Sequence, residues 1–229
     1  MKLIKLNSLL FLCLFSISCQ SSTKKQTSTV ATDGTSSKVE LKKTPQDLSK
    51  YETAYFASGC FWCVEAVFES VKGVKEAVSG YSGGIEKNPT YQQVGAGNTS
   101  HAEAVMVYYD PKIVSFETLV RVFFGSQDPT QYNGQGPDIG AQYRSIAFYK
   151  NDEEKEIIER YIKQLEDKEI YSKPIVTQVA PFDKFWKAED YHQDYEKRNP
   201  NNPYVKNVSI PRLKRFQKKY PELLKDNVH

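Results

Sequence analysis

The chain has 229 residues, of which 39% are hydrophobic and 26% charged, with a net charge of +3 at pH 7. This length suits one domain with a substantial core and some additional sequence. Acidic and basic residues are interspersed, so the charge balance gives no sign of a nucleic-acid partner, and we expect none. The chain has four cysteines: Cys13, Cys19, Cys60 and Cys63.

The N-terminus indicates export. Lys2 and Lys5 form a basic segment, and residues 9–15 form an apolar run that is too short to span a bilayer. We therefore predict a signal peptide over residues 1–18. A small residue precedes Cys19, and this arrangement resembles a bacterial lipoprotein signal in which Cys19 carries the lipid. The residue three before the cysteine is a serine instead of the usual aliphatic residue, so an ordinary cleaved signal with a soluble product stays open.

Residues 19–50 are predicted to be a disordered tether. They are rich in Ser, Thr, Lys and Gln and contain hardly any large apolar side chain, so they cannot bury enough surface to order themselves. We expect the tether to separate the domain from a membrane that the lipid on Cys19 anchors. The predicted location is the periplasm or the cell surface.

A predicted strand and helix flank the next two cysteines. Residues 53–57 are aromatic and bounded by polar residues, which is typical of a strand. Gly59 allows a sharp turn, and Ser58 is a candidate N-cap. Apolar residues then recur at the spacing of an amphipathic helix: Phe61, Val64, Phe68 and Val71. Cys60 is therefore predicted at the first turn of a helix that is entered directly from a strand.

This position favours thiol chemistry at Cys60. The free amides and the dipole at a helix N-terminus favour an anion, so we expect a lowered pKa for the Cys60 thiol. Cys63 lies one turn further on the same side, close enough for the two sulfurs to bond. The alternatives are a small buried apolar residue or half of a zinc site. A zinc site would need His101 and His192, whose spacing does not match a zinc finger, so we predict no metal.

The later elements alternate between strands and helices. The predicted strands are residues 74–80, 101–109, 143–149 and 175–179, and the predicted amphipathic helices are residues 116–124 and 152–165. Ser115 is expected to cap the first of these helices, and a short basic helix begins near Pro211. Together these elements predict an α/β (α+β) two-layer sandwich, with a mixed sheet covered by amphipathic helices in a ferredoxin-like plait.

Glu103 is the second candidate for chemistry. It lies among apolar residues in the predicted strand 101–109, where burial disfavours the carboxylate. A neutral carboxyl can donate a proton. The alternative is an edge position with the carboxylate in water or paired with a lysine. Tyr91, Asp138 and Tyr143 come from loops, where they are either ligand contacts or structural loop residues.

Five motifs in order resemble the peptide methionine sulfoxide reductases of the A type, over about residues 51–203. Each motif alone is weak, but the ordered set is specific. The motifs are Gly59-Cys60-Phe61-Trp62, Gly80-Tyr81 with Gly83-Gly84, Asn88-Pro89-Thr90-Tyr91, His101-Ala102-Glu103-Ala104-Val105 and Gln142-Tyr143-Arg144-Ser145.

The resemblance implies reduction of the S epimer of methionine sulfoxide, free or within a protein, to methionine. It implies that Cys60 is the nucleophile and becomes a sulfenic acid, and that Glu103 protonates the sulfoxide oxygen. It also implies a substrate pocket with two hydroxyls, one further acid and an aromatic wall around the S-methyl group. The corresponding residues are Tyr91, Tyr143, Asp138, Phe61 and Trp62.

The chain departs from many members of that family at Cys63. Those members have glycine at this position and a resolving cysteine near the C-terminus, whereas no cysteine follows Cys63 here. By elimination, we predict that Cys63 attacks the sulfenic acid to give a Cys60–Cys63 disulfide. We then expect a thioredoxin-fold reductant on the same side of the membrane and no bound cofactor. The catalytic domain is predicted over residues 51–203, followed by a basic C-terminal extension over residues 204–229.

Two other functions stay open at this point. A general thiol–disulfide exchanger would use the C-x-x-C but would not need Glu103, Tyr91 or Tyr143. A surface lipoprotein that binds a partner would use the two cysteines as a structural disulfide.

Overall fold

The computed structural model describes residues 47–226, which belong to one compact unit. The predicted signal peptide, the lipid-bearing Cys19 and nearly all of the predicted tether lie outside the described residues. Within residues 47–226, no helix combines the length and the apolar character needed to cross a membrane.

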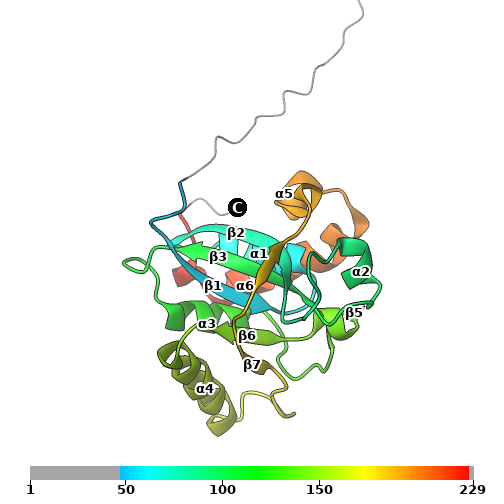
Figure 1. The fold of residues 1–229 in the computed structure, drawn as a ribbon. Helices are drawn as coiled ribbons and strands as arrows, with labels where there is room; N and C mark the ends of the chain where they lie inside the picture. Colours follow the sequence, from blue (N-terminus) through cyan, green and yellow to red (C-terminus); the bar gives the residue numbers. More distant parts are fainter. Residues whose placement is uncertain (1–46, 227–229) are drawn as a thin grey trace, which may run out of the picture. The chain divides into compact units, whose positions relative to one another are not determined.

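Six strands form one mixed sheet in the order β7–β6–β1–β3–β2–β8 (Figure 1). The strands are β1 (Glu52–Ala57), β2 (Val74–Ser82), β3 (Ala102–Tyr109), β6 (Ile146–Tyr149), β7 (Gln178–Pro181) and β8 (Phe185–Lys187). β6 and β7 are parallel, and all other neighbours are antiparallel. The central order β6–β1–β3–β2 is that of a ferredoxin-like plait. The predicted α/β sandwich with a mixed sheet is therefore confirmed.

The helices α1 (Phe61–Glu69) and α3 (Phe116–Gly125) are the two crossovers of this plait. Their apolar sides pack on the sheet, and the rings of Phe68 and Phe123 both stack against Phe56 of β1, at 5.0 and 5.1 Å between centroids. Ser115 caps α3 as predicted, because its Oγ accepts a hydrogen bond from the Thr118 N–H at 3.1 Å. Because α1 packs its aromatic side chains on the same sheet face as α3, the first turn of α1 is held in place next to the end of β1.

The remaining elements are short, apart from α4 and α6. They are α2 (Tyr91–Gly95), the β4 (Gly134–Gln135) and β5 (Asp138–Ile139) hairpin, α4 (Asp152–Asp167), α5 (Tyr195–Arg198), a π-helical turn (Val205–Ser209) and α6 (Ile210–Lys219). Single 3₁₀ turns occur at Ala141–Tyr143, Asp190–His192 and Pro221–Leu223. Pro211 lies in the first turn of α6, as predicted.

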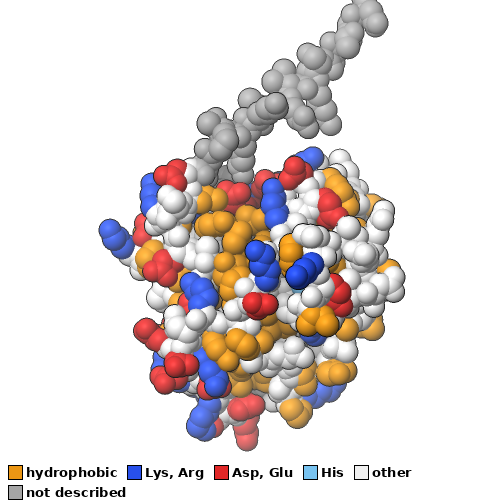
Figure 2. Space-filling view, in the orientation of Figure 1, with side chains coloured by type: hydrophobic (Ala, Val, Ile, Leu, Met, Phe, Trp, Pro, Cys, Tyr) orange, Lys and Arg blue, Asp and Glu red, His pale blue; other side chains and the backbone are white. Residues whose placement is uncertain are grey.

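Part of the other face of the sheet is covered by the segment that leads from β7 to β8. Phe182 stacks on Tyr55 of β1 with ring centroids 3.6 Å apart, and Phe185 approaches the same ring. Figure 2 shows apolar side chains gathered over the middle of the face in view, with charged side chains around them. Helices therefore cover one face of the sheet, and a mostly extended segment covers part of the other.

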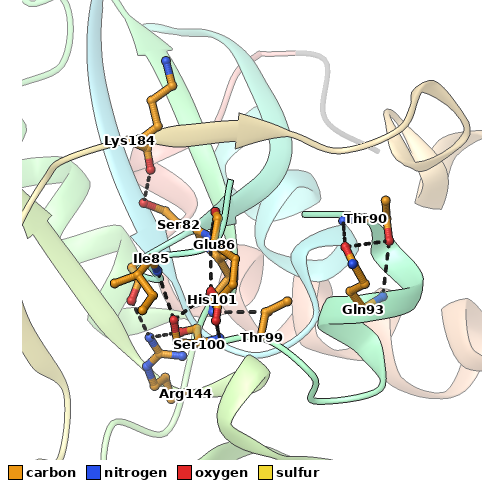
Figure 3. A network of polar contacts seen from close by, with 11 residues as sticks. Ser82, Ile85, Glu86, Thr90, Gln93, Thr99, Ser100, His101, Arg144 and Lys184 are labelled. Atoms are coloured by element: carbon orange, nitrogen blue, oxygen red, sulfur yellow. Dashed lines mark hydrogen bonds and ion pairs between the residues drawn. The ribbon is translucent and has the colours of Figure 1, made fainter. Parts of the chain in front are cut away.

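The starts of two strands and the presence of one helix differ from the sequence prediction. The strand predicted from Tyr143 begins at Ile146, because residues 141–143 form a 3₁₀ turn. The strand predicted at residues 175–179 is β7, whose pairing begins where the Gln178 N–H donates to the Ser145 carbonyl at 2.9 Å. Helix α2 begins at Tyr91, which was predicted to lie in a loop. It forms because Thr90 and Gln93 make a reciprocal capping box (Figure 3).

Residues 204–226 pack as part of the same unit. Val205 and Phe216 are fully buried, and α6 packs beside α1. The Lys72 N–H donates to the Leu223 carbonyl at 2.8 Å, and the Lys225 N–H donates to the Ser70 carbonyl at 2.9 Å. The domain boundary predicted at residue 203 therefore falls inside the packed unit, because the segment after it buries apolar side chains against α1.

Candidate active site

The candidate site begins where the chain turns from β1 into α1. Gly59 has φ +78°, and a Cβ at this position would lie 2.5 Å from the Gln135 Cβ, so both backbone and packing require glycine here. Cys60 is the N-cap residue of α1. The prediction of Ser58 as the cap was wrong: Ser58 is fully buried before the turn, and its Oγ accepts a hydrogen bond from Arg212 at 3.0 Å.

One amide at the start of α1 donates to a side chain of the sheet: the Phe61 N–H donates to Glu103 Oε2 on β3 at 3.0 Å. The backbone amide of Cys60 lowers the pKa of Asp138 on β5, and that of Trp62 lowers the pKa of the Cys60 thiol, both against a larger effect of burial. This helix end therefore acts on two carboxyl groups and one thiol.

Glu103 is 2% exposed in the central strand β3. Burial raises the pKa of this carboxyl to about 8, although the hydrogen bond from the Phe61 N–H lowers it. The neighbouring Asp138 and Cys63 raise it further. The carboxyl is therefore protonated at neutral pH, as the apolar neighbours in the sequence suggested. The alternative of an edge position in water is excluded, because the residue is buried and β3 lies between β1 and β2 in the sheet.

Cys60 and Cys63 are both free thiols, 7% and 2% exposed. Burial raises the pKa of Cys60 well above its ordinary value, and the hydrogen bond to Cys63 and the Glu103 charge add to the rise. The hydrogen bond from Cys60 lowers the pKa of Cys63 to about 6. Burial raises this pKa and the charge of Arg212 lowers it, each by less than the hydrogen bond does. The predicted lowering at Cys60 was wrong for this state, because burial and the neighbouring Cys63 and Glu103 outweigh the helix amide of Trp62, which lowers the pKa.

Two loop tyrosines lie around the same centre. Burial raises the pKa of Tyr91 to about 12 and raises that of Tyr143 as well, and the charges of Glu103 and Cys60 act on both hydroxyls in the same direction. Both phenols therefore stay protonated and can donate hydrogen bonds. The backbone of Tyr143 also contributes, because its carbonyl accepts the Gly59 N–H at 3.1 Å.

An aromatic wall begins at α1. The Phe61 ring is buried and lies 5.0 Å from the ring of His192 and 5.9 Å from that of Tyr81. Trp62 is partly exposed, stacks on Tyr195 at 3.7 Å, and donates its indole N–H to His192 Nδ1 at 3.1 Å. The structure therefore brings Phe61 and Trp62 to the start of α1 beside Cys60, Glu103, Tyr91, Asp138 and Tyr143.

A second group of residues at the site was not predicted from the sequence; they follow residue 188, and of them only His192 was considered, as a zinc ligand. Tyr204 donates its hydroxyl to Asp138 Oδ2 at 2.6 Å and lies 3.7 Å from Cys63 Sγ. Glu189 accepts the Tyr91 N–H at 2.9 Å and therefore positions α2. His192 orients Trp62. These residues lie in irregular segments more than 100 positions from Cys60, and no periodicity or composition marks them.

The Gly-rich loops beside the site are tied together by Arg144 (Figure 3). Its Nη2 donates to the Gly83 carbonyl at 3.1 Å and to the Ser100 carbonyl at 3.0 Å. His101 Nε2 lies 2.8 Å from the Glu86 carbonyl in the same network. These contacts connect the loop after β2 with the turn before β6, which carries Tyr143 at its end.

The two histidines and two cysteines do not form a metal site. His101 belongs to the loop network and His192 to the aromatic wall. In the described part of the chain, the ligand atoms close enough to share one ion belong to Glu65, Glu69 and Asp194. The ammonium of Lys197 already bonds to the last two of these carboxylates.

Comparisons with known proteins agree on one family. The sequence pattern of the family "Peptide methionine sulfoxide reductase" matches residues 52–224. The peptide methionine sulfoxide reductase MsrA 1 of Rhodopirellula baltica is 48% identical over 82% of this chain and 94% of its own length.

Two solved structures resemble this one. Methionine sulfoxide reductase A of Corynebacterium diphtheriae has a TM-score of 0.59 and 36% identity over 66% of this chain and 76% of its own. Mxr1 of Saccharomyces cerevisiae in its reduced form has a TM-score of 0.63 and 32% identity over 70% of this chain and 92% of its own.

Proposed function

Because the chain belongs to the peptide methionine sulfoxide reductase family, we propose that Cys60 is the nucleophile of its reaction and Glu103 the proton donor. The enzyme is an oxidoreductase that reduces methionine sulfoxide by thiol chemistry. One observation carries the assignment of roles: Glu103 accepts a hydrogen bond from the amide that directly follows Cys60. A carboxyl that is protonated at neutral pH therefore lies beside the candidate nucleophile.

In the first step, the Cys60 sulfur attacks the sulfoxide sulfur. The S–O bond of the substrate breaks, the oxygen ends on Cys60 as a sulfenic acid, and methionine leaves as the thioether. Glu103 donates its proton to this oxygen, because negative charge develops there as the bond weakens. The pKa of Cys63 is lowered to about 6, so its thiolate is present at neutral pH beside the Cys60 thiol and takes up the thiol proton as the Cys60 sulfur attacks.

The substrate pocket binds the S epimer of methionine sulfoxide, free or within a protein. Tyr91 and Tyr143 donate hydrogen bonds to the sulfoxide oxygen, because their raised pKa values keep both phenols protonated. Asp138 supplies the further acid. Phe61 and Trp62 form the wall around the S-methyl group, where sulfur–aromatic contact is favourable.

Cys63 resolves the sulfenic acid. Its position on the first turn of α1 and its hydrogen bond with Cys60 support this role. Attack by the Cys63 thiolate on the sulfenic sulfur gives a Cys60–Cys63 disulfide and releases water. No other cysteine occurs in residues 47–226.

A thioredoxin-fold protein reduces this disulfide by thiol–disulfide exchange, and no bound cofactor takes part. Cys60 and Cys63 are both buried, so the reductant must bring an exposed thiol of its own to this pair.

The enzyme acts outside the cytoplasm on oxidised exported proteins. The apolar run and Cys19 at the N-terminus support export with a lipid anchor on Cys19. Radiolabelled palmitate in wild type and in Cys19→Ser tests this proposal. Incorporation that is lost in Cys19→Ser supports the anchor, and absence of label from the wild type contradicts it.

The central proposal is tested by reduction of a methionine-sulfoxide peptide with dithiothreitol. We expect methionine from the wild type with the S epimer, none from Cys60→Ser and a large loss in Glu103→Gln. Activity that survives in Cys60→Ser would overturn the assignment of the nucleophile. Equal rates with both epimers would contradict the proposed stereospecificity.

A further inference from the structure

Arg212 is a buried cation on the Cys63 side of the site. Its side chain comes from α6 and the residue is 6% exposed. Its Nε donates to the Ser126 carbonyl at 2.8 Å, Nη1 to the Ser58 carbonyl at 2.8 Å and Nη2 to Ser58 Oγ at 3.0 Å. All of these acceptors are neutral, and among residues 47–226 no carboxylate forms an ion pair with it. Burying a cation without a counter-ion costs free energy of folding, and the hydrogen bonds to Ser58 and Ser126 do not neutralise the charge. The charge of Arg212 therefore needs an explanation besides these hydrogen bonds.

The charge of Arg212 acts on the second cysteine. Arg212 and Cys63 line the same groove of about 350 Å³, which Asp138 and Arg215 also line. The guanidinium lowers the pKa of Cys63 in addition to the larger effect of the hydrogen bond from Cys60. Arg212 also acts on Asp138, but burial outweighs both the guanidinium charge and the hydrogen bond from Tyr204, so the pKa of this carboxyl is raised, whereas that of Cys63 is lowered. The thiolate of Cys63 is therefore the better candidate for the missing counter-ion.

We propose that Arg212 is a positioning residue for the resolving step, and that its guanidinium stabilises Cys63 as the thiolate that attacks the Cys60 sulfenic acid. This inference rests on the proposed function, because it requires Cys63 to be the resolving cysteine. In this step the new S–S bond forms as the S–O bond of Cys60 breaks. Cys63 is oxidised, the sulfenic sulfur of Cys60 is reduced, and the departing hydroxide takes up a proton and leaves as water.

The change of state at Cys60 makes the cation important. In the reduced enzyme the Cys60 thiol donates the hydrogen bond that stabilises the Cys63 thiolate most. Once Cys60 has become a sulfenic acid this thiol no longer exists, whereas the charge of Arg212 remains. The other ionisable groups that act on Cys63 or line its groove are Glu103 on β3, Asp138 on β5, Tyr204 before α6 and Arg215 on α6.

The test compares Arg212→Gln, Arg212→Lys and Arg215→Gln. Glutamine can still donate a hydrogen bond to Ser58 but has no charge. Lysine keeps the charge but lacks the planar guanidinium whose two nitrogens donate to Ser58. Arg215 lines the same groove but is exposed, so it is the matched control. The midpoint of Cys63 ionisation is measured in full-length Cys60→Ser from the pH dependence of iodoacetamide labelling, with mass spectrometry of the peptide that contains residue 63. In proteins that retain Cys60, one turnover without reductant gives the rates of methionine release and of disulfide formation.

We expect the Cys63 midpoint to rise by about one pH unit or more in Arg212→Gln, to move less in Arg212→Lys and to stay in place in Arg215→Gln. Disulfide formation by Arg212→Gln should be roughly fivefold slower at pH 6 and should recover at pH 9, because the larger thiolate fraction restores the rate. An unchanged midpoint in Arg212→Gln, or a loss of rate that is the same at every pH, would overturn the proposal in favour of a purely structural clamp.

The same turnover distinguishes failure of the underlying function. If the wild type releases no methionine, the proposed activity is wrong whatever the midpoints show. If it releases methionine without a Cys60–Cys63 disulfide, Cys63 is not the resolving cysteine and the role of Arg212 is overturned with it. Should Arg212→Gln fail to fold, a midpoint in Arg212→Lys far above that of the wild type would count against a role for the charge.

Discussion

The two sides of the first turn of α1 have opposite electrostatic character. On the Cys60 side, the sheet and the loops supply Glu103, Tyr91 and Tyr143, whose pKa values are all raised. These groups are therefore neutral proton or hydrogen-bond donors at neutral pH. On the Cys63 side, the C-terminal segment supplies the buried cation Arg212, and the pKa of the thiol is lowered.

This difference matches the two steps of the reaction. Reduction of the sulfoxide needs a donor that still holds its proton, whereas resolution of the sulfenic acid needs a thiolate. One uniform environment could not favour both, since the burial that protects the proton of Glu103 also disfavours a thiolate. The structure separates the two demands over one helical turn.

The largest effect is expected from removal of the proton donor on the Cys60 side. Glu103→Gln keeps the size of the side chain but has no acidic proton, so the rate of methionine release in the first turnover should fall by about 10²–10⁴-fold. In the wild type, the proton is present below the pKa of about 8 and lost above it, so this rate should fall as the pH rises through 8. Rapid-quench measurements between pH 6 and 9 check both points. A wild-type rate that rises through pH 8 would contradict the role of Glu103.

A core variant tests whether the Cys63 side is an integral part of the domain. Phe216 of α6 is fully buried, so Phe216→Ala should lower the free energy of unfolding by about 3 kcal/mol. Lys218→Ala, an exposed change on the same helix, is the control and should have little effect. Urea denaturation gives both values. Equal stability of Phe216→Ala and wild type would mean that α6 does not contribute to the core.

The Cys60 side could largely be predicted from the sequence. The apolar periodicity of α1 and the apolar neighbours of Glu103 are local patterns, and they indicate a helix and a buried strand. Even there, local reasoning gave the wrong direction for the pKa of Cys60. Burial and the nearby Glu103 on β3 raise this pKa, and the sequence of α1 contains no sign of either.

The Cys63 side could not be predicted. Tyr204 and Arg212 lie in a polar, basic stretch, and their surroundings depend on how α6 packs against α1. A basic helix with one apolar stripe gives no sign that one of its arginines is buried. The sequence therefore indicated a C-terminal extension where the structure has one wall of the site.

A smaller effect is expected from removal of the resolving thiol. Cys63→Ser should still release methionine in the first turnover, because Cys60 and Glu103 are present. Steady-state turnover with a dithiol protein reductant should fall by about tenfold or more, since the sulfenic acid can no longer form the internal disulfide. Turnover with dithiothreitol is the control and should fall less, because a small dithiol can reach the sulfenic acid directly. Unchanged turnover with the protein reductant would mean that it attacks Cys60.

The smallest effect is expected from a change at Tyr204, which tests where the two sides meet because its hydroxyl contacts groups on both. Its hydroxyl donates to Asp138 at 2.6 Å and lies 3.7 Å from Cys63 Sγ, so Tyr204→Phe removes a link without opening a cavity. The loss of one hydrogen bond should slow disulfide formation by a few-fold, about 1 kcal/mol, and leave methionine release nearly unchanged. Tyr195→Phe is the matched control, because that ring also packs on Trp62 but its hydroxyl bonds only to Asn202, at 3.4 Å. If Tyr204→Phe slowed methionine release as much as disulfide formation, Asp138 and Tyr204 would belong to the sulfoxide step, and the division between the two sides would lie between Tyr204 and Arg212.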